Sequence, residues 1–281
     1  MLSDTIHPKN SFFKLLELNV SEVEHHPDAF NRLRHDEVQG IMVHGIYPQE
    51  TLQSVVQRLE HHTPPFLQTW FPQPFRSFFY GQNLNLSPPD LSAYFRETPA
   101  FQQQLAQLFP SACGITDYFA GILSGLDHNR PVLAPQGPNP GEHYMFTTIR
   151  AHLEGGYIPP HFDNEQALRP SYRHLLTLIH PHIYSFVLAF TRAESGGALE
   201  IFNHQMEPAG STIINDDHHK AKFDLNELES VSFRIPPGSV LIVDSGRFLH
   251  RLTPVQGPQK RWTVCSFMAL SRDANSLYCW G

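Results

Sequence analysis

The spacing of apolar residues along the chain changes near residue 145. Before this point, apolar residues recur three and four positions apart over 49–61 and 99–109, which is typical of amphipathic helices. The second helix is predicted to begin at Thr98-Pro99, an N-cap residue followed by proline at the first helical position. Two short apolar strands are also predicted, over 12–18 and 41–43. We therefore predict a helical N-terminal part over about residues 1–145.

After residue 145, short apolar segments alternate with turn residues such as Gly196-Gly197 and Pro236-Pro237-Gly238. The segments predicted as strands are 146–153, 175–179, 183–190, 198–202, 231–235, 240–243 and 262–270. Many short strands at this spacing indicate an antiparallel sandwich or barrel. We expect an α+β, β-rich chain whose β-core covers about residues 146–281. Because neither an internal repeat nor a clear linker interrupts the sequence, one domain over 1–281 is predicted.

Three segments are predicted as loops. The aromatic, proline-rich stretch 64–80 reads as an irregular packed loop, and the alternative is a substrate-pocket wall formed by Phe75, Phe78, Phe79 and Tyr80. Residues 129–142 hold four prolines and two glycines, and residues 203–228 are a polar insert. Both are candidate lids over a site, with plain surface loops as the alternative.

Composition and charge narrow the classes of protein. A hydrophobic fraction of 41% with 21 phenylalanines supplies a folded core. A net charge of −7 without a Lys/Arg cluster argues against nucleic acid and anionic membranes as partners. Neither a secretion signal nor an apolar run of membrane-spanning length is visible. The three scattered cysteines fit neither a disulfide scaffold nor a zinc site, so we expect reduced thiols in a cytoplasmic protein. The sequence shows no sign of an obligate protein partner.

Candidate chemistry begins with His161-Phe162-Asp163. Taken alone the tripeptide is weak, because 18 His and 12 Asp in 281 residues give about 0.8 chance matches to His-x-Asp. A second match, His26-Pro27-Asp28, does occur, in a polar run that reads as a solvated turn leading into a helix. The residues around each match must therefore decide which of the two is a metal site.

The surroundings of His161 favour a metal site. The residue follows Ile158-Pro159-Pro160 at the end of a predicted strand, where alternation points His161 and Asp163 to one side and Phe162 to the other. His250, after the next strands, can supply a third ligand. Two imidazoles and a carboxylate can occupy one face of iron(II) and leave the opposite face open for a co-substrate and dioxygen.

Arg261 and Thr263 extend this constellation. They lie two residues apart on the predicted strand after His250, and hence on the same side of it. An arginine fork beside a hydroxyl suits the end of a dicarboxylate. A buried arginine in a β-core is otherwise costly, which favours a ligand-binding role.

The order His-x-Asp, His and Arg-x-Thr in a β-rich half resembles the iron(II)/2-oxoglutarate-dependent oxygenases. A closer likeness is to the freestanding aliphatic halogenases of the welwitindolinone and hapalindole alkaloid pathways. The motifs that carry it are Thr148-Ile149-Arg150, Leu153-Glu154-Gly155, Ile158-Pro159, His161-Phe162-Asp163-Asn164-Glu165, Gly246-Arg247, His250-Arg251, Tyr278 and Trp280, with Gly81-Gln82 and the segment 90–95 upstream. The likeness covers most of the chain and is specific around the ligands.

The resemblance implies a double-stranded β-helix (jelly-roll, cupin-like) core with N-terminal helices packed on it. It also implies that His161, Asp163 and His250 bind Fe(II), and that Arg261 and Thr263 bind 2-oxoglutarate, the co-substrate used with O2. The likeness fails at one position, because those halogenases carry Gly where this chain has Asp163, and the missing carboxylate leaves their chloride site. The family's cofactors are therefore expected here, and its halogenation is not.

The expected reaction is hydroxylation of an unactivated C–H bond in a small molecule, and the resemblance points to a natural product as that substrate. Four residues are candidates for substrate contact: Phe79, Tyr80, Arg150 and Phe162. Desaturation, cyclisation or epimerisation at the same iron centre stays open, because these outcomes diverge after hydrogen abstraction. A non-catalytic β-sandwich binding protein is the alternative from another class.

Overall fold

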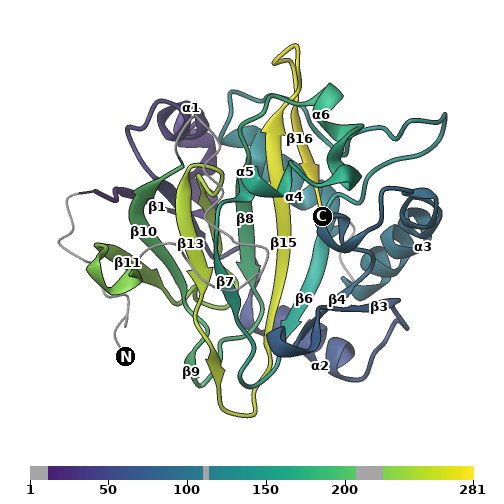
Figure 1. Cartoon of the computed structure of the whole chain (residues 1–281), viewed down its shortest axis with the longest axis horizontal. Helices are drawn as coiled ribbons and strands as arrows, with labels where there is room; N and C mark the ends of the chain where they lie inside the picture. The colour runs from purple at the N-terminus through teal and green to yellow at the C-terminus, as the bar shows by residue number, and fades with distance from the viewer. Residues whose placement is uncertain (1–11, 110–113, 207–223) are drawn as a thin grey trace.

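Two β-sheets face each other at the centre of the molecule in the computed structural model, which describes residues 12–109, 114–206 and 224–281 (Figure 1). The larger sheet runs, in spatial order, through β1 (Leu15–Asn19), β2 (Gly40–His44), β12 (Val240–Val243), β8 (Tyr184–Ala189), β15 (Arg261–Leu270), β6 (Thr148–His152), β4 (Ser77–Tyr80) and β3 (Gln68–Trp70). Strand β16 (Leu277–Trp280) pairs with β15 and with β5 (Val132–Leu133). Only the β1–β2 and β16–β5 pairs are parallel among the described strand pairs.

The smaller sheet carries His161 and His250. Its order is β11 (Ser230–Phe233), β10 (Leu199–Gln205), β13 (Phe248–Leu252) and β7 (Ile158–His161). A further two-stranded ribbon joins β14 (Val255–Gln256) to β9 (Ser195–Gly196). Together the two facing sheets make a double-stranded β-helix, so the predicted β-rich α+β fold is confirmed.

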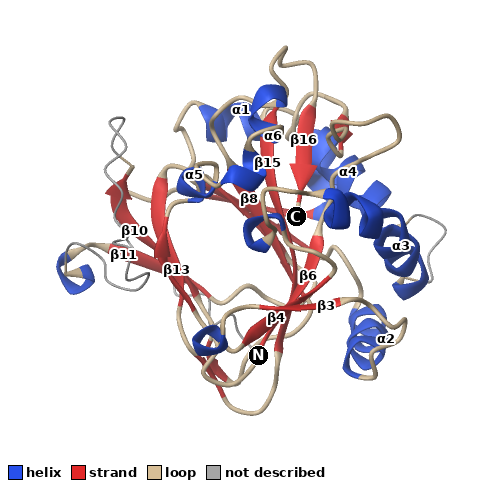
Figure 2. Cartoon of the chain, turned by 45° about the vertical axis from the view of Figure 1, so that its right-hand side comes forward, coloured by secondary structure: helices blue, strands red, loops and turns tan. Residues whose placement is uncertain are grey.

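The longer helices cover the outer face of the larger sheet (Figure 2). The α-helices are α1 (Ala29–Arg34), α2 (Gln49–Glu60), α3 (Ser92–Leu108), α4 (Ile115–Gly125), α5 (Asp163–Gln166) and α6 (Leu175–Leu178). The short 3-10 helices are η1 (Val20–His25), η2 (Gln73–Phe75), η3 (Leu84–Leu86), η4 (Pro170–Tyr172) and η5 (Leu225–Glu227). None of the described helices is both long enough and apolar enough to cross a bilayer.

Alternation along β6 and β15 separates an apolar face from a polar one. Ile149 and Val264 are fully buried in the largest hydrophobic cluster, which also takes residues from α2, α3 and α4. The residues between them point to the other side, where Arg150 pairs with Thr263 and His152 pairs with Arg261 across the two strands. The sheet thus buries its helix-facing side and presents polar groups to the smaller sheet.

Several predicted elements are wrong in type or in extent. Residues 175–178 form α6 and not a strand, because a short apolar run has no period long enough to tell one from the other. The segment 64–80 is not all loop, since it contains β3 and β4. Its prolines mislead because they lie outside both strands. Helix α4 had no predicted counterpart.

The helix predicted over 99–109 begins seven residues earlier than expected. Pro99 lies inside α3, which starts at Ser92. The upstream turn is held by the burial of Tyr94 and Phe95 and by the Thr98 hydroxyl, which donates to the Tyr94 carbonyl at 3.0 Å. Tertiary burial therefore extends the helix across a residue pair that normally starts one. Of the two candidate lids, 129–142 contains the short β5, and residues 207–223 of the other lie outside the described part of the chain.

Candidate metal centre

Two histidines are brought side by side by the pairing of β13 with β7. His250 lies directly opposite His161 in this antiparallel register, and their ring centroids are 4.3 Å apart. Both side chains face the larger sheet and line the cavity between the sheets. The pairing therefore joins two residues that are 89 positions apart in the sequence.

Asp163 joins them through the local backbone. Phe162 has extended dihedral angles (φ −110°, ψ 140°), so His161 and Asp163 project to one side and Phe162 to the other. Asp163 is the first residue of α5, so its carboxylate lies at the start of a helix. The sequence had predicted that it lies at the end of a strand. Its backbone N–H donates to the carbonyl of Ser245 at 2.9 Å. This hydrogen bond ties the helix start to the turn before β13.

The three side chains form a compact set of ligand atoms. Nε2 of His161 lies 3.4 Å from one Asp163 oxygen, and Nε2 of His250 lies 3.8 Å from the other. Their ligand atoms all lie within 4.8 Å of one another. Within the described ranges, no other group of three His, Cys, Asp or Glu residues meets this spacing. Asp28, from the second His-x-Asp match, is exposed at the start of α1.

Hydrogen bonds prepare both imidazoles to bind a metal. Nδ1 of His161 donates to the Pro159 carbonyl at 2.8 Å, and Nδ1 of His250 donates to the Phe248 carbonyl at 3.0 Å. A carbonyl can only accept, so in each neutral ring the proton is on Nδ1 and the Nε2 lone pair faces Asp163. Such an outer hydrogen bond is what normally fixes a metal-binding histidine.

The protonation states also suit a divalent cation. Burial and the neighbouring His161 together lower the pKa of His250 to about 4, so this ring is neutral near pH 7. Burial opposes ionisation of Asp163, but His250 and His161 outweigh it and lower the pKa of the carboxyl group. Two imidazole nitrogens and one carboxylate are the donor set that iron(II) oxygenases use.

A cavity of about 440 Å³ opens in front of this set. Residues from both sheets line it, and Phe71, Phe75 and Tyr157 form much of its apolar wall. Phe75 belongs to the predicted pocket wall, whereas Phe71 and Tyr157 were not singled out in the sequence. The aromatic run before residue 80 was the signal for Phe71, and Tyr157 gave none.

Arg261 reaches the same cavity from β15. Its side chain is buried, and no described carboxylate lies within ion-pair distance of it. Burial lowers its pKa to about 10, which keeps the guanidinium charged at neutral pH. Thr263 lies on the same side of the strand, fully buried, with its hydroxyl 3.4 Å from Sγ of Cys265. The pair suits the carboxylate of a bound dicarboxylic acid.

The four candidate substrate residues lie in different places. Arg150 lines the cavity, and Phe79 lies beneath it, 4.4 Å from the guanidinium carbon to the ring centre. Tyr80 points to the opposite face, where its hydroxyl donates to the Leu59 carbonyl at 3.0 Å. Phe162 packs with Phe202 and Leu249, because its extended backbone turns it away from the ligands. Phe79, Tyr80 and Phe162 do not line the cavity, so of the four candidates only Arg150 is placed to contact a substrate there.

A double-stranded β-helix with two histidines and an aspartate in its cavity defines the class of iron(II)/2-oxoglutarate-dependent oxygenases. Comparison with known families agrees. The chain belongs to the family described as "Carrier-protein-independent halogenase WelO5", whose profile matches residues 12–281. No curated protein sequence matches the chain.

Solved structures share the fold at low sequence identity. The N-substituted L-amino acid dioxygenase of Burkholderia ambifaria AMMD, in complex with alpha-KG, has a TM-score of 0.55 at 12% identity and covers 91% of both chains. A Trichoplax adhaerens prolyl hydroxylase bound to a peptide fragment has a TM-score of 0.50 at 9% identity, covering 91% of this chain and 94% of that one. The epimerase SnoN in complex with Fe3+, alpha ketoglutarate and nogalamycin RO has a TM-score of 0.50 at 10% identity, with coverages of 88% and 83%.

Proposed function

We propose that this chain is an iron(II)/2-oxoglutarate-dependent dioxygenase that hydroxylates an unactivated C–H bond of a small-molecule, natural-product substrate. The observation that carries the proposal is the Asp163 carboxylate, which lies 3.4 Å and 3.8 Å from the Nε2 atoms of His161 and His250. We further propose that residues 1–281 act as a single oxygenase domain.

The described residues fit the cofactors in distinct roles. His161, Asp163 and His250 would hold iron(II), and Arg261 with Thr263 would bind the distal carboxylate of 2-oxoglutarate. Together with dioxygen, bound iron(II) and 2-oxoglutarate would supply the oxidising power that breaks the C–H bond. The protein's own part is to orient the substrate and to exclude water, which the apolar side of the cavity supports.

Asp163 favours hydroxylation over the halogenation for which the family is named. A six-coordinate iron with three protein ligands has three positions left, which a chelating 2-oxoglutarate and dioxygen can fill. A halide would need a further position, and in this chain the Asp163 carboxylate would take it. Family membership is the observation that favours halogenation as the second candidate.

Product mass separates these outcomes. Candidate substrates are incubated with protein, iron(II), 2-oxoglutarate, oxygen and chloride, and products are weighed by mass spectrometry. Hydroxylation adds one oxygen atom. A product that lacks two hydrogens indicates desaturation or cyclisation in place of hydroxylation. A chlorinated product from the wild type would overturn the role given to Asp163.

The Asp163→Gly variant tests that role from the other side. Removal of the carboxylate is expected to open a position for halide, detected as a chloride-dependent change in the visible spectrum of the iron complex. A variant that binds iron but shows no chloride dependence would refute this role for the carboxylate. If wild-type protein bound no iron(II) and formed no succinate with any candidate substrate, the non-catalytic binding protein would be the better reading.

A further inference from the structure

Arg150 is held in the cavity wall without a polar partner for its buried Nε. It projects from β6 between Phe79 on β4 and Thr263 on β15, which are its partners in the strand register. Its guanidinium carbon lies 4.4 Å from the ring centre of Phe79 and 5.6 Å from that of Phe71. The Nε atom is buried and makes no hydrogen bond in the structure. Two aromatic rings therefore fix the group while leaving its donors available.

Two of the other three cavity arginines, Arg251 and Arg169, have polar partners that Arg150 lacks. Arg251 forms an ion pair of 2.5 Å with Glu200 on the neighbouring strand. Arg169 is exposed, and its Nε donates to the side-chain oxygen of Gln166 at 2.7 Å. No carboxylate of the described residues lies within ion-pair distance of Arg150.

With the proposed cofactors bound, the charge of Arg150 has no counter-charge in the cavity. The two charges of iron(II) and the charge of Arg261 balance the Asp163 carboxylate and the two carboxylates of 2-oxoglutarate. Arg150 then remains as a cation of the cavity wall without a partner anion. Its Nε atom is buried, and a charge taken out of water is costly unless an anion joins it. Because Arg261 already serves the distal end of the co-substrate, the missing anion has to come from another molecule.

We propose that Arg150 binds a carboxylate group of the substrate, whose apolar body packs against Phe71, Phe75 and Tyr157. The substrate class is thus an amphipathic organic acid. The inference rests on the proposed function, because it assigns the co-substrate to Arg261 and the metal to the His/Asp set. A planar guanidinium stacked on Phe79 is oriented to present its remaining N–H groups to a carboxylate.

Matched pairs of probes test the inference without turnover. The protein is loaded with manganese(II) and saturated with 2-oxoglutarate, and is then titrated calorimetrically with phenylacetate, phenylbutyrate and indole-3-butyrate and with their primary amides. At least one acid is expected to bind roughly tenfold more tightly than its amide, as a charge-assisted hydrogen bond requires. The Arg150→Gln variant loses this preference, and Arg150→Lys retains part of it. Arg169→Gln, a change to another cavity arginine, keeps it.

The affinities for manganese(II) and 2-oxoglutarate serve as a second readout. In Arg150→Gln both are expected to stay within about twofold of wild type, which also shows that the variant folds. If Arg150→Gln lowered the affinity for 2-oxoglutarate as strongly as Arg261→Gln does, Arg150 would bind the co-substrate and the inference would be wrong. It would equally fall if no acid bound better than its amide. Failure of the wild type to bind manganese(II) or 2-oxoglutarate would instead refute the proposed function.

Discussion

One backbone carbonyl sets the orientation of each imidazole in the candidate metal centre. The carbonyls of Pro159 and Phe248 accept from the Nδ1 atoms of His161 and His250, and each lies two residues before the histidine it orients. The Nε2 lone pairs are thereby directed at the site before any metal arrives. The protein meets the cost of ordering the ligands during folding, and metal binding does not have to supply it.

Buried neutral histidines make the metal-free protein sensitive to acid. The folded pKa of His250 is about 4, and burial with two nearby arginines holds the pKa of His152 well below its usual 6.5. Below pH 6.5 the unfolded chain takes up protons that the folded chain does not, so stability falls as the pH drops from about 6.5 toward 4. For each of these two histidines, we expect the unfolding free energy to fall by about 1.4 kcal/mol per pH unit in this range.

Denaturant unfolding of the protein, freed of metal with a chelator, at pH 7, 6 and 5 measures this loss. A His152→Leu variant should show a shallower dependence than the wild type, because one of the two rings is gone. An unfolding free energy that stayed constant between pH 7 and pH 5 would be inconsistent with two neutral buried rings.

At the residue scale, the sequence predicted the ligands better than the pocket. His161, Asp163 and His250 could be foreseen because alternation and strand order bring them together. Phe71 and Tyr157 could not, because their positions depend on how loops from distant parts of the chain fold over the sheet. The hydroxyl of Tyr80 bonds to α2, a contact that no local pattern reveals.

Among the elements, the short helix α5 matters most, because it begins with Asp163. The side-chain oxygen of Asn164 accepts from the Ile183 backbone N–H at 2.9 Å, and Gly246 donates to the Ile183 carbonyl at 2.8 Å. A Cβ on Gly246 would lie 2.3 Å from that Asn164 oxygen and 2.5 Å from the Ile183 carbonyl. The helix start is therefore anchored where only glycine fits.

The Gly246→Ala variant should displace α5 and weaken metal binding. We expect iron(II) affinity to fall about 10- to 100-fold, as is usual when the support of a ligand is lost. Gly121→Ala is the matched control, since Gly121 is exposed in α4 and a Cβ there meets nothing within 4 Å. Anaerobic iron(II) titration of both variants measures the effect. Wild-type affinity in Gly246→Ala would show that the anchor does not position Asp163.

The elements themselves were predictable where their period was long or their strands central. Helix α2 and strand β12 match their predicted ranges closely. Helix α6 was not predictable, because four apolar residues fit either structure. The start of α3 was missed because burial of its first turn outweighed the helix-start signal at Thr98-Pro99.

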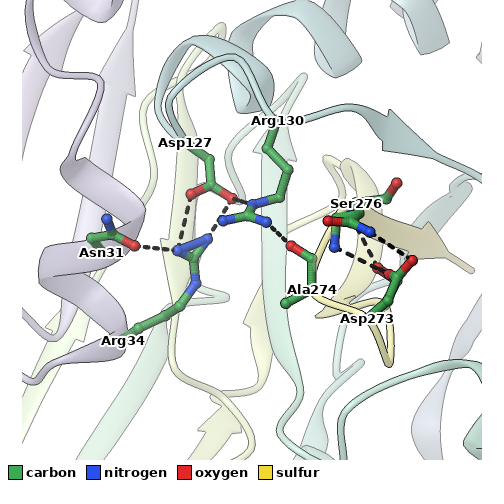
Figure 3. Close-up of polar contacts among 9 residues, drawn as sticks. Asn31, Arg34, Asp127, Arg130, Asp273, Ala274 and Ser276 are labelled. Atoms are coloured by element: carbon green, nitrogen blue, oxygen red, sulfur yellow. Dashed lines mark hydrogen bonds and ion pairs between the residues drawn. The ribbon is translucent and has the colours of Figure 1, made fainter.

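At the scale of the whole molecule, a buried carboxylate links segments that are distant in sequence (Figure 3). Asp127 is fully buried, accepts from Arg34 of α1 at 2.9 Å, and accepts from Arg130 at 2.8 Å. Arg130 also donates to the Ala274 carbonyl, in the turn between β15 and β16. One side chain thus joins the N-terminal helices to the C-terminal hairpin.

Removal of this carboxylate should cost more stability than removal of a surface one. Asp127→Asn leaves two partly buried guanidinium groups without their anion, and we expect a loss of about 3 kcal/mol. The control is Glu37→Gln, because Glu37 is exposed and lies 3.8 Å from Arg32. Its removal should cost under about 1 kcal/mol. Urea unfolding compares the two, and similar losses would show that the network does not hold the segments together.

The largest hydrophobic cluster also spans both parts of the chain, from Leu18 to Trp280. That continuity supports the prediction of one domain over 1–281. The two-sheet architecture was predictable from the rhythm of short strands. The order of the strands was not, because β4 and β2 come from the part of the chain predicted to be mainly helical and yet extend the larger sheet.

The central claim is that His161, Asp163 and His250 form an iron(II) site that works with 2-oxoglutarate. Anaerobic titration tests it most directly, and the second His-x-Asp match supplies the control. Wild type and Asp28→Ala should both bind about one equivalent of iron(II) and develop a visible charge-transfer band when 2-oxoglutarate is added. Asp163→Ala should bind iron(II) at least about tenfold more weakly. Equal affinity in Asp163→Ala and wild type, or no band in wild type, would contradict the account.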